Sequence, residues 1–162
     1  MVKILVLYFS RGGNTKAMAE EVAAGVKEAG GEVVLEEITR ARVEELVEAD
    51  GIIIGSPSYF GGPAAEVKRF LDESIRVRGK LEGKVGAAFC SSRHRAGGRE
   101  TTMLSILQSM LIHGMVVCGD PLSTGGHYGA AANGPPDEQA RRECFGLGKK
   151  VTELAWRLKG GR

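Results

Sequence analysis

The sequence lacks clustered cysteines, a long hydrophobic run and a strong excess of one charge. Its cysteines, Cys90, Cys118 and Cys144, stand far apart without a Cys-x-x-Cys pair, which excludes a recognisable zinc, iron–sulfur or disulfide framework. No apolar run approaches the ~18 residues that a membrane-spanning helix needs. With 22 Lys and Arg against 20 Asp and Glu, neither nucleic acid nor an anionic membrane is required as a partner. We therefore expect a soluble, cytoplasmic protein with reduced cysteines and no metal site.

Glycine, by contrast, is abundant, with 24 in 162 residues and no Gly-x-y period. Such an excess is typical of turns and of loops that approach a ligand closely. The length suits one domain of ordinary size, so residues 1–162 are expected to form a single domain.

Apolar runs alternate with segments of helical periodicity along the chain. Residues 4–9 and 51–55 are apolar without alternation, as in strands buried on both faces of a parallel sheet. Further strands are predicted at 32–38, 85–90 and 115–118, and helices at 14–29, 42–49, 63–73, 98–113 and 137–159. Residues 120–136 are expected to be the longest stretch without regular structure. The pattern predicts an α/β domain, a doubly wound three-layer sandwich.

In such sheets, ligands bind outside the carboxyl ends of the strands. The first strand is followed by Ser10, Arg11, Gly12, Gly13, Asn14 and Thr15, which run directly into a helix. Hydroxyls, glycines and a helix N-terminus together favour a bound phosphate, and the alternative is a polar turn with an N-cap. The segment matches neither a Walker A loop nor Gly-x-Gly-x-x-Gly, so nucleoside triphosphate and Rossmann dinucleotide sites are not supported.

Two later strand ends carry similar signals. The third is followed by Pro57, Ser58, Tyr59, Phe60 and Gly61, whose aromatics suit a planar ring system or, alternatively, cover a neighbouring helix. The fourth is followed by Ser91, Ser92, Arg93, His94, Arg95 and Gly97, which suit close contact with a ligand and add positive charge, unless that charge is merely solvated. His113 ends a predicted helix, where a histidine commonly acts as a cap or dipole partner.

These loops on one α/β chain resemble the flavodoxin-like superfamily over about residues 2–159. Within it, the sequence is most similar to the WrbA family of NAD(P)H:quinone oxidoreductases. The resemblance is carried by residues 6–10 (VLYFS), 55–61 (GSPSYFG), 69–72 (RFLD), 113–117 (HGMVV) and 125–130 (GGHYGA).

The resemblance implies a five-stranded parallel sheet in the order 2-1-3-4-5 with helices on both faces. It implies FMN, with its phosphate in the 10–15 loop and its ring against Ser58, Tyr59 and Phe60, Ser91 to Gly97, and His113. It also implies two-electron reduction of a quinone or similar acceptor by NAD(P)H, in a homo-oligomer (dimer or tetramer). The cofactor-binding set is then Ser10, Arg11, Gly12, Gly13, Asn14, Thr15, Pro57, Ser58, Tyr59, Phe60, Gly61, Ser91, Ser92, Arg93, His94, Arg95, Gly97 and His113, with no catalytic side chain and no metal ligand.

The sequence also departs from the family. The family's insertion after the second strand is absent from residues 37–49, its tryptophan before the fourth strand has no match, and residues 93–95 replace a run of Thr and Gly. One alternative is a flavodoxin-type electron carrier without NAD(P)H activity, which the low acidity argues against. Another is a regulatory or scaffold protein that has lost flavin, which the retained glycines and hydroxyls argue against.

Overall fold

The computed structural model describes residues 1–160, and its centre is a parallel sheet. The strands β1 (Lys3–Tyr8), β2 (Glu32–Glu37), β3 (Gly51–Tyr59), β5 (Val85–Ser92) and β6 (Val116–Val117) are ordered β2-β1-β3-β5-β6. Because the short β4 (Gly62–Pro63) is an antiparallel addition to β3, this order is the predicted 2-1-3-4-5. The flavodoxin-like fold is therefore confirmed.

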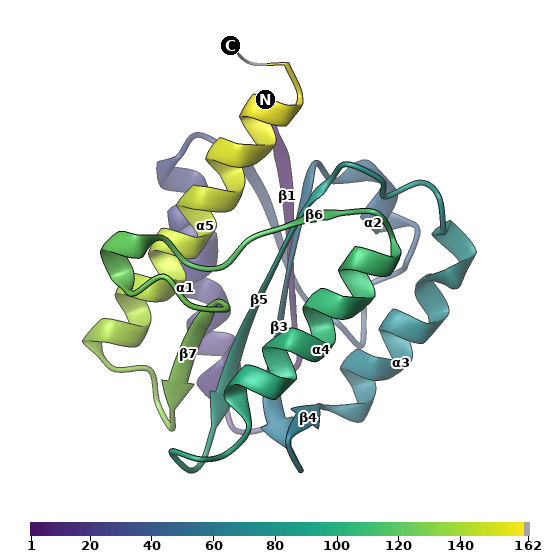
Figure 1. Ribbon diagram of the computed structural model, residues 1–162. Coiled ribbons are helices and arrows are strands. Elements are labelled where there is room, and N and C mark those ends of the chain that lie inside the picture. The colour runs from purple at the N-terminus through teal and green to yellow at the C-terminus, as the bar shows by residue number, and fades with distance from the viewer. Residues whose placement is uncertain (161–162) are drawn as a thin grey trace.

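Helices cover both faces of the sheet (Figure 1). On one face lie α1 (Asn14–Glu28) and α5 (Glu138–Leu158); on the other lie α2 (Glu45–Glu48), α3 (Ala65–Glu73) and α4 (Arg99–Ile112). Alternate strand residues supply the two cores: Ile4 and Val6 pack on the α1 and α5 side, and Leu5 and Leu7 on the other side. Burial on both faces explains why these strands are apolar without alternation.

The last position of the sheet is divided between two strands. The short β6 pairs with Val85 and Gly86, whereas β7 (Ala130–Asn133) pairs with the carboxyl half of β5. The expectation that residues 120–136 lack regular structure is thus wrong, since they contain β7 and a 3-10 turn, η2 (Leu122–Thr124). The buried Asp120 carboxylate organises the intervening loop by accepting hydrogen bonds from the backbone N–H groups of Gly126 and His127.

Glycine makes the approach of β7 to β5 possible. A Cβ built on Gly129, which has φ +152°, would lie 2.0 Å from the carbonyl oxygen of Ala88. Small residues follow in β7, and Ala130 and Ala132 are buried against the α1 and α5 side of the core. Close packing against β5 therefore specifies β7, and the hydrophobic periodicity of the sequence gives no sign of this strand.

The predicted boundaries differ most around β3. The strand continues to Tyr59 and forms a hairpin with β4, so α3 begins at Ala65 instead of the expected residue 63. Within residues 1–160, no helix combines the length and the apolar character needed to cross a membrane.

Candidate functional site

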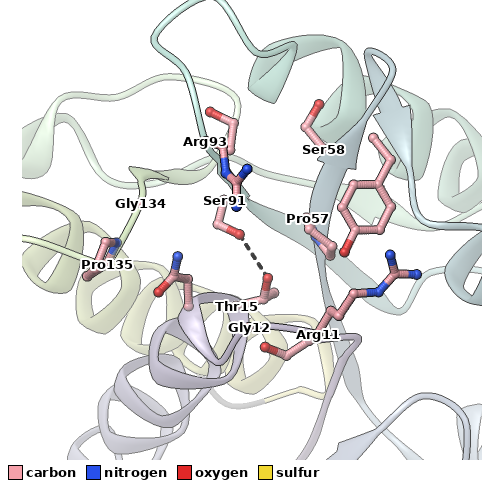
Figure 2. Close-up of a pocket in the computed structure, with 13 residues that line it drawn as sticks. Arg11, Gly12, Thr15, Pro57, Ser58, Ser91, Arg93, Gly134 and Pro135 are labelled. Atoms are coloured by element: carbon pink, nitrogen blue, oxygen red, sulfur yellow. Dashed lines mark hydrogen bonds between the residues drawn. The ribbon is translucent and has the colours of Figure 1, made fainter.

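A cavity of about 690 Å³ opens at the carboxyl ends of β1, β3, β5 and β7 (Figure 2). This volume is within the range of small-molecule sites, roughly 300–1,000 Å³. The lining residues are Ser10, Arg11, Gly12, Asn14, Thr15, Pro57, Ser58, Tyr59, Ser91, Ser92, Arg93, Gly134 and Pro135. The fold thus brings together members of all three loops that the sequence analysis singled out.

One wall of the cavity is the N-terminus of α1. Gly13 precedes the helix with φ 97° and donates its backbone N–H to the Ser10 hydroxyl at 3.0 Å. No side chain caps the helix and its first turn contains no acidic residue, so the N–H groups that begin a helix stay available to an anion. A Cβ built on Gly12 or Gly13 would have no protein atom within 4 Å, which leaves this loop open. The donor set and the open loop fit a phosphate.

The floor of the cavity is tied together by hydroxyl groups from distant parts of the chain. Thr15 Oγ1 and Ser91 Oγ lie 2.9 Å apart, and both side chains are buried (Figure 2). This hydrogen bond joins α1 to the end of β5. It holds the two loops at a fixed separation before any ligand binds.

The aromatic side of the site is the β3–β4 hairpin. Tyr59 pairs with Gly62 across the hairpin, and the two residues of its turn, Phe60 and Gly61, have φ values of 50° and 78°. A left-handed conformation is unusual for phenylalanine, and the Phe60 side chain is fully exposed at the tip. Tyr59 lines the cavity, and the guanidinium carbon of Arg11 lies 5.2 Å from the centre of its ring.

The third side follows β5 and is positively charged. Arg93 lines the cavity, whereas His94, Arg95 and Gly97 lie beyond its lining, and the side chains of His94 and Arg95 are exposed. The lining contains two arginines and no carboxylate. An anionic ligand would therefore meet favourable electrostatics in the cavity.

Cys90 is a buried thiol near the carboxyl end of β5. Burial raises the pKa of Cys90 to about 12, so the thiol stays protonated and is a poor nucleophile.

His113 lies apart from the cavity within one chain. It ends α4 beside Gly114, whose carbonyl accepts the N–H of Gly83 near the amino end of β5. The cavity is at the opposite, carboxyl end of β5, about one α4 length or ~20 Å away. Any contact of His113 with a ligand in this cavity would have to come from another copy of the chain.

The surroundings of His113 determine its protonation. Its Nε2 is 2.7 Å from Ser74 Oγ, and Ser74 donates its own proton to the carbonyl of Leu71. Nε2 therefore carries a proton, and Nδ1 is a buried acceptor without a partner among residues 1–160. Burial, with a smaller contribution from Arg78, lowers the pKa of His113.

Gly134 and Pro135 are the lining residues that the sequence analysis missed. They follow β7, which lies beside the carboxyl half of β5, so the turn after β7 meets the same edge of the sheet. The Gly-Pro-Pro sequence signals a turn, but only the recognition of β7 as a strand would have placed it at the site.

The family model for NADPH-dependent FMN reductases matches residues 34–129, which is more than half of the chain. The chain belongs to this family. An NAD(P)H dehydrogenase (quinone) from Archaeoglobus fulgidus is 37% identical, with 98% of this chain and the whole of that relative covered. A flavodoxin from Aquifex aeolicus is 38% identical over all of this chain and 91% of its own length.

Solved structures agree with this membership of the FMN reductase family. The flavodoxin, WrbA-like protein from Agrobacterium tumefaciens superposes with a TM-score of 0.81 at 26% identity, covering 97% of this chain and 99% of that one. The WrbA-type family predicted from the sequence is therefore confirmed. The alignment with the Archaeoglobus relative spans 190 positions, so that protein contains segments that this shorter family member lacks.

Proposed function

We propose that the protein is an FMN-dependent NAD(P)H:quinone oxidoreductase. The observation that carries this proposal is the cavity itself, which joins an uncapped helix N-terminus to an aromatic hairpin and has two arginines but no carboxylate in its lining. Relatives named NAD(P)H dehydrogenase (quinone), 34–40% identical to this chain, support the donor and the class of acceptor.

The proposed binding set divides between the two ends of FMN. The loop from Ser10 to Thr15 holds the phosphate through backbone N–H groups and the α1 dipole. Tyr59 and Phe60 pack against the ring, and residues 91–97 close another edge. Bound FMN supplies the hydride and electron transfer, while the chain supplies binding, orientation and electrostatics.

A flavodoxin-type electron carrier is the second candidate. The Aquifex relative and an archaeal flavodoxin structure, with a TM-score of 0.78 at 29% identity, favour it. The charge of the site favours the enzyme. Arg11 and Arg93 line the cavity, and positive charge stabilises the extra negative charge that two-electron reduction of a flavin brings.

The proposal includes a homo-oligomer. Residues 101–119 contain no Asp, Glu, Lys or Arg, although α4 lies on the surface. Leu104, Leu111 and Ile112 are exposed on this helix, with Ile75 exposed on the neighbouring 3-10 turn. An apolar face of this kind suits burial against the same face of a second copy.

Residues 1–162 act as one FMN-binding domain in this proposal, and the protein is cytoplasmic. The three cysteines are free thiols, as expected in a reducing compartment.

The test is a comparison of donor oxidation with and without an acceptor. Protein reconstituted with FMN should bleach at visible wavelengths when NADH or NADPH is added anaerobically, and p-benzoquinone should restore the absorbance over many turnovers. An absence of FMN binding would remove the basis of the proposal. FMN binding without NAD(P)H oxidation in the presence of quinone would favour the electron carrier.

A further inference from the structure

We propose that the exposed surface beside the cavity is a docking site for an acidic protein that accepts single electrons from reduced FMN. The surface consists of the turn from Arg93 to Arg95, called here the basic turn, and of Phe60 at the tip of the β3–β4 hairpin. This inference rests on the FMN site of the proposed function, and it adds a protein acceptor to the small quinone.

The basic turn carries positive charge that is free of ion pairs within residues 1–160. Arg93, His94 and Arg95 are consecutive and exposed. None of the ion pairs among the described residues includes any of the three, whereas Arg141 on α5 pairs with Glu21 at 2.6 Å. The charge of the turn is therefore available to a partner.

Most of this charge lies outside the cavity. Only Arg93 belongs to the cavity lining, and the exposed side chains of His94 and Arg95 lie beyond it. A small quinone in the cavity meets Arg93, whereas a protein that covers the opening meets all three side chains, because a standard interface buries about 800 Å² on each partner. The placement of the charge therefore indicates a macromolecular partner.

Phe60 gives the same surface an apolar anchor. Its side chain is fully exposed, and its φ of 50° lies in the left-handed region that phenylalanine rarely adopts. Strained backbone of this kind clusters at ligand-binding and switch regions. The ring has two faces, so contact with the flavin leaves one face for a partner. Aromatic residues and arginine are the types enriched at the centre of protein–protein interfaces, which is the combination found here.

The hairpin and the turn after β5 are joined by direct contacts. The Ser58 hydroxyl donates to the carbonyl of Gly97, and Thr101 Oγ1 donates to the carbonyl of Gly61 at 2.7 Å. A Cβ built on Gly98 would lie 2.6 Å from the Cα of Gly61. The aromatic tip and the basic turn therefore belong to one continuous surface.

The backbone of the basic turn is held by hydrogen bonds. The His94 carbonyl accepts from the Ser92 hydroxyl at 2.8 Å and from the Gly97 N–H at 3.0 Å. The Arg95 carbonyl accepts from Arg99 Nη2 at 3.0 Å. A fixed backbone presents the basic side chains to a partner at lower entropic cost than a mobile loop would.

The sign of the charge determines the partner. The cavity lining adds Arg11 to Arg93 and contains no carboxylate. The acidic residue nearest to the basic turn in the sequence is Glu100, which directly follows Arg99. Opposite charges steer association and raise its rate by about 10- to 1,000-fold at low salt. We therefore expect a partner with an acidic surface around its redox group.

The electron transfer balances with two partner molecules. Reduced FMN holds two electrons, and each partner molecule accepts one of them at its own redox group. FMN returns to its oxidised form and releases its protons to solvent. NAD(P)H, the donor in the proposed function, then supplies the next electron pair.

Two one-electron acceptors of opposite charge serve as kinetic probes: an acidic plant plastocyanin and the basic cytochrome c. FMN-loaded protein is reduced photochemically, without NAD(P)H, and mixed anaerobically with each oxidised probe, whose reduction is followed by visible absorbance. Between about 0.01 M and about 0.15 M salt the Debye length falls from about 30 Å to about 8 Å. The rate with plastocyanin should fall at least tenfold over this range, and the rate with cytochrome c should stay level or rise.

Two variants with the same change in net charge locate the effect. Arg95→Glu reverses a charge in the basic turn, and the control Arg157→Glu reverses an exposed one in the last turn of α5. Arg95→Glu should lower the low-salt rate with plastocyanin at least tenfold and weaken its salt dependence. The control should stay within about twofold of the wild type. Equal effects of the two variants, or a plastocyanin rate that does not depend on salt, would overturn the inference.

Binding is measured separately from electron transfer. Cuprous plastocyanin is titrated into the isotope-labelled protein with oxidised FMN bound, and the changes in amide chemical shift should concentrate at Phe60 and the basic turn and disappear at high salt. Absent or scattered changes with intact quinone reduction would overturn the docking site alone. If NAD(P)H is not oxidised but these changes and the salt-dependent transfer remain, the proposed enzyme function fails while the docking site stands. A protein that binds no FMN would overturn both proposals.

Discussion

Gly12→Ala is the most direct test of whether the loop after β1 binds the phosphate of FMN. Gly12 lines the cavity, lies outside the left-handed region, and would have no protein atom within 4 Å of an added Cβ. The methyl group should therefore cause neither strain nor a clash in the free protein. Since alanine also restricts the unfolded chain, the free protein should gain about 0.4–1 kcal/mol of stability. For a domain of this size, that raises Tm by about 1–4 °C.

FMN affinity should change in the opposite direction. The added methyl would stand in the open space where the proposed phosphate lies against the backbone. Forcing one methyl group into a filled site costs about 1–3 kcal/mol, which weakens binding by about fivefold to 150-fold. Titration of the apoprotein with FMN, followed by the quenching of flavin fluorescence, measures the Kd directly.

A matched control is Gly62→Ala. Gly62 also has an open Cβ position and no left-handed φ, but it does not line the cavity. Its FMN Kd should stay within about threefold of the wild-type value. The reasoning is refuted if Gly12→Ala binds FMN as tightly as the wild type does, or if its loss of affinity is matched by a fall in the Tm of the free protein.

Three further changes test other parts of the account. Replacing Tyr59 and Phe60 together by Ala should raise the fluorescence emission of bound FMN or release the flavin, because contacts with aromatic rings quench flavin fluorescence. Unchanged emission and affinity would assign both side chains to structural packing. His113→Gln should flatten the loss of Tm between pH 7.5 and 5. The lowered pKa of His113 means that its stabilising effect is present above its ordinary pKa and is lost as protonation begins at lower pH. Parallel Tm profiles for the two proteins would contradict this assignment. Leu111→Glu should reduce the mass measured by light scattering to that of one 17.2 kDa chain, and a wild-type protein already at that mass would contradict the proposed homo-oligomer.

Much of the site could be predicted because parallel strands end at one edge of their sheet. The segments after β1, β3 and β5 carry glycines, hydroxyls, aromatics and cations in the sequence, and the strand order brings them to one cavity. Only the fact that the carboxyl ends of these strands lie together had to be inferred. In doubly wound folds, this arrangement of strand ends is general.

Other contacts had no local signal. Gly134 and Pro135 reach the cavity because β7 packs on β5, and β7 consists of three alanines and an asparagine with no strand-like alternation. His113 was included through resemblance, yet its position at the far end of α4 follows from the length and direction of that helix.

The sequence by itself determined the order of strands and helices, since hydrophobic runs and helical periods depend on neighbouring residues and on burial of whole faces. It also determined that Ser10 to Thr15 enter a helix, with glycine at the one position where φ is positive. Only the tertiary structure decided that Thr15 meets Ser91, 76 residues away, and that Phe60 stands exposed at the tip of a hairpin. Those contacts depend on strand register and on how closely two backbones can approach, which are properties of the packed sheet and not of any short segment.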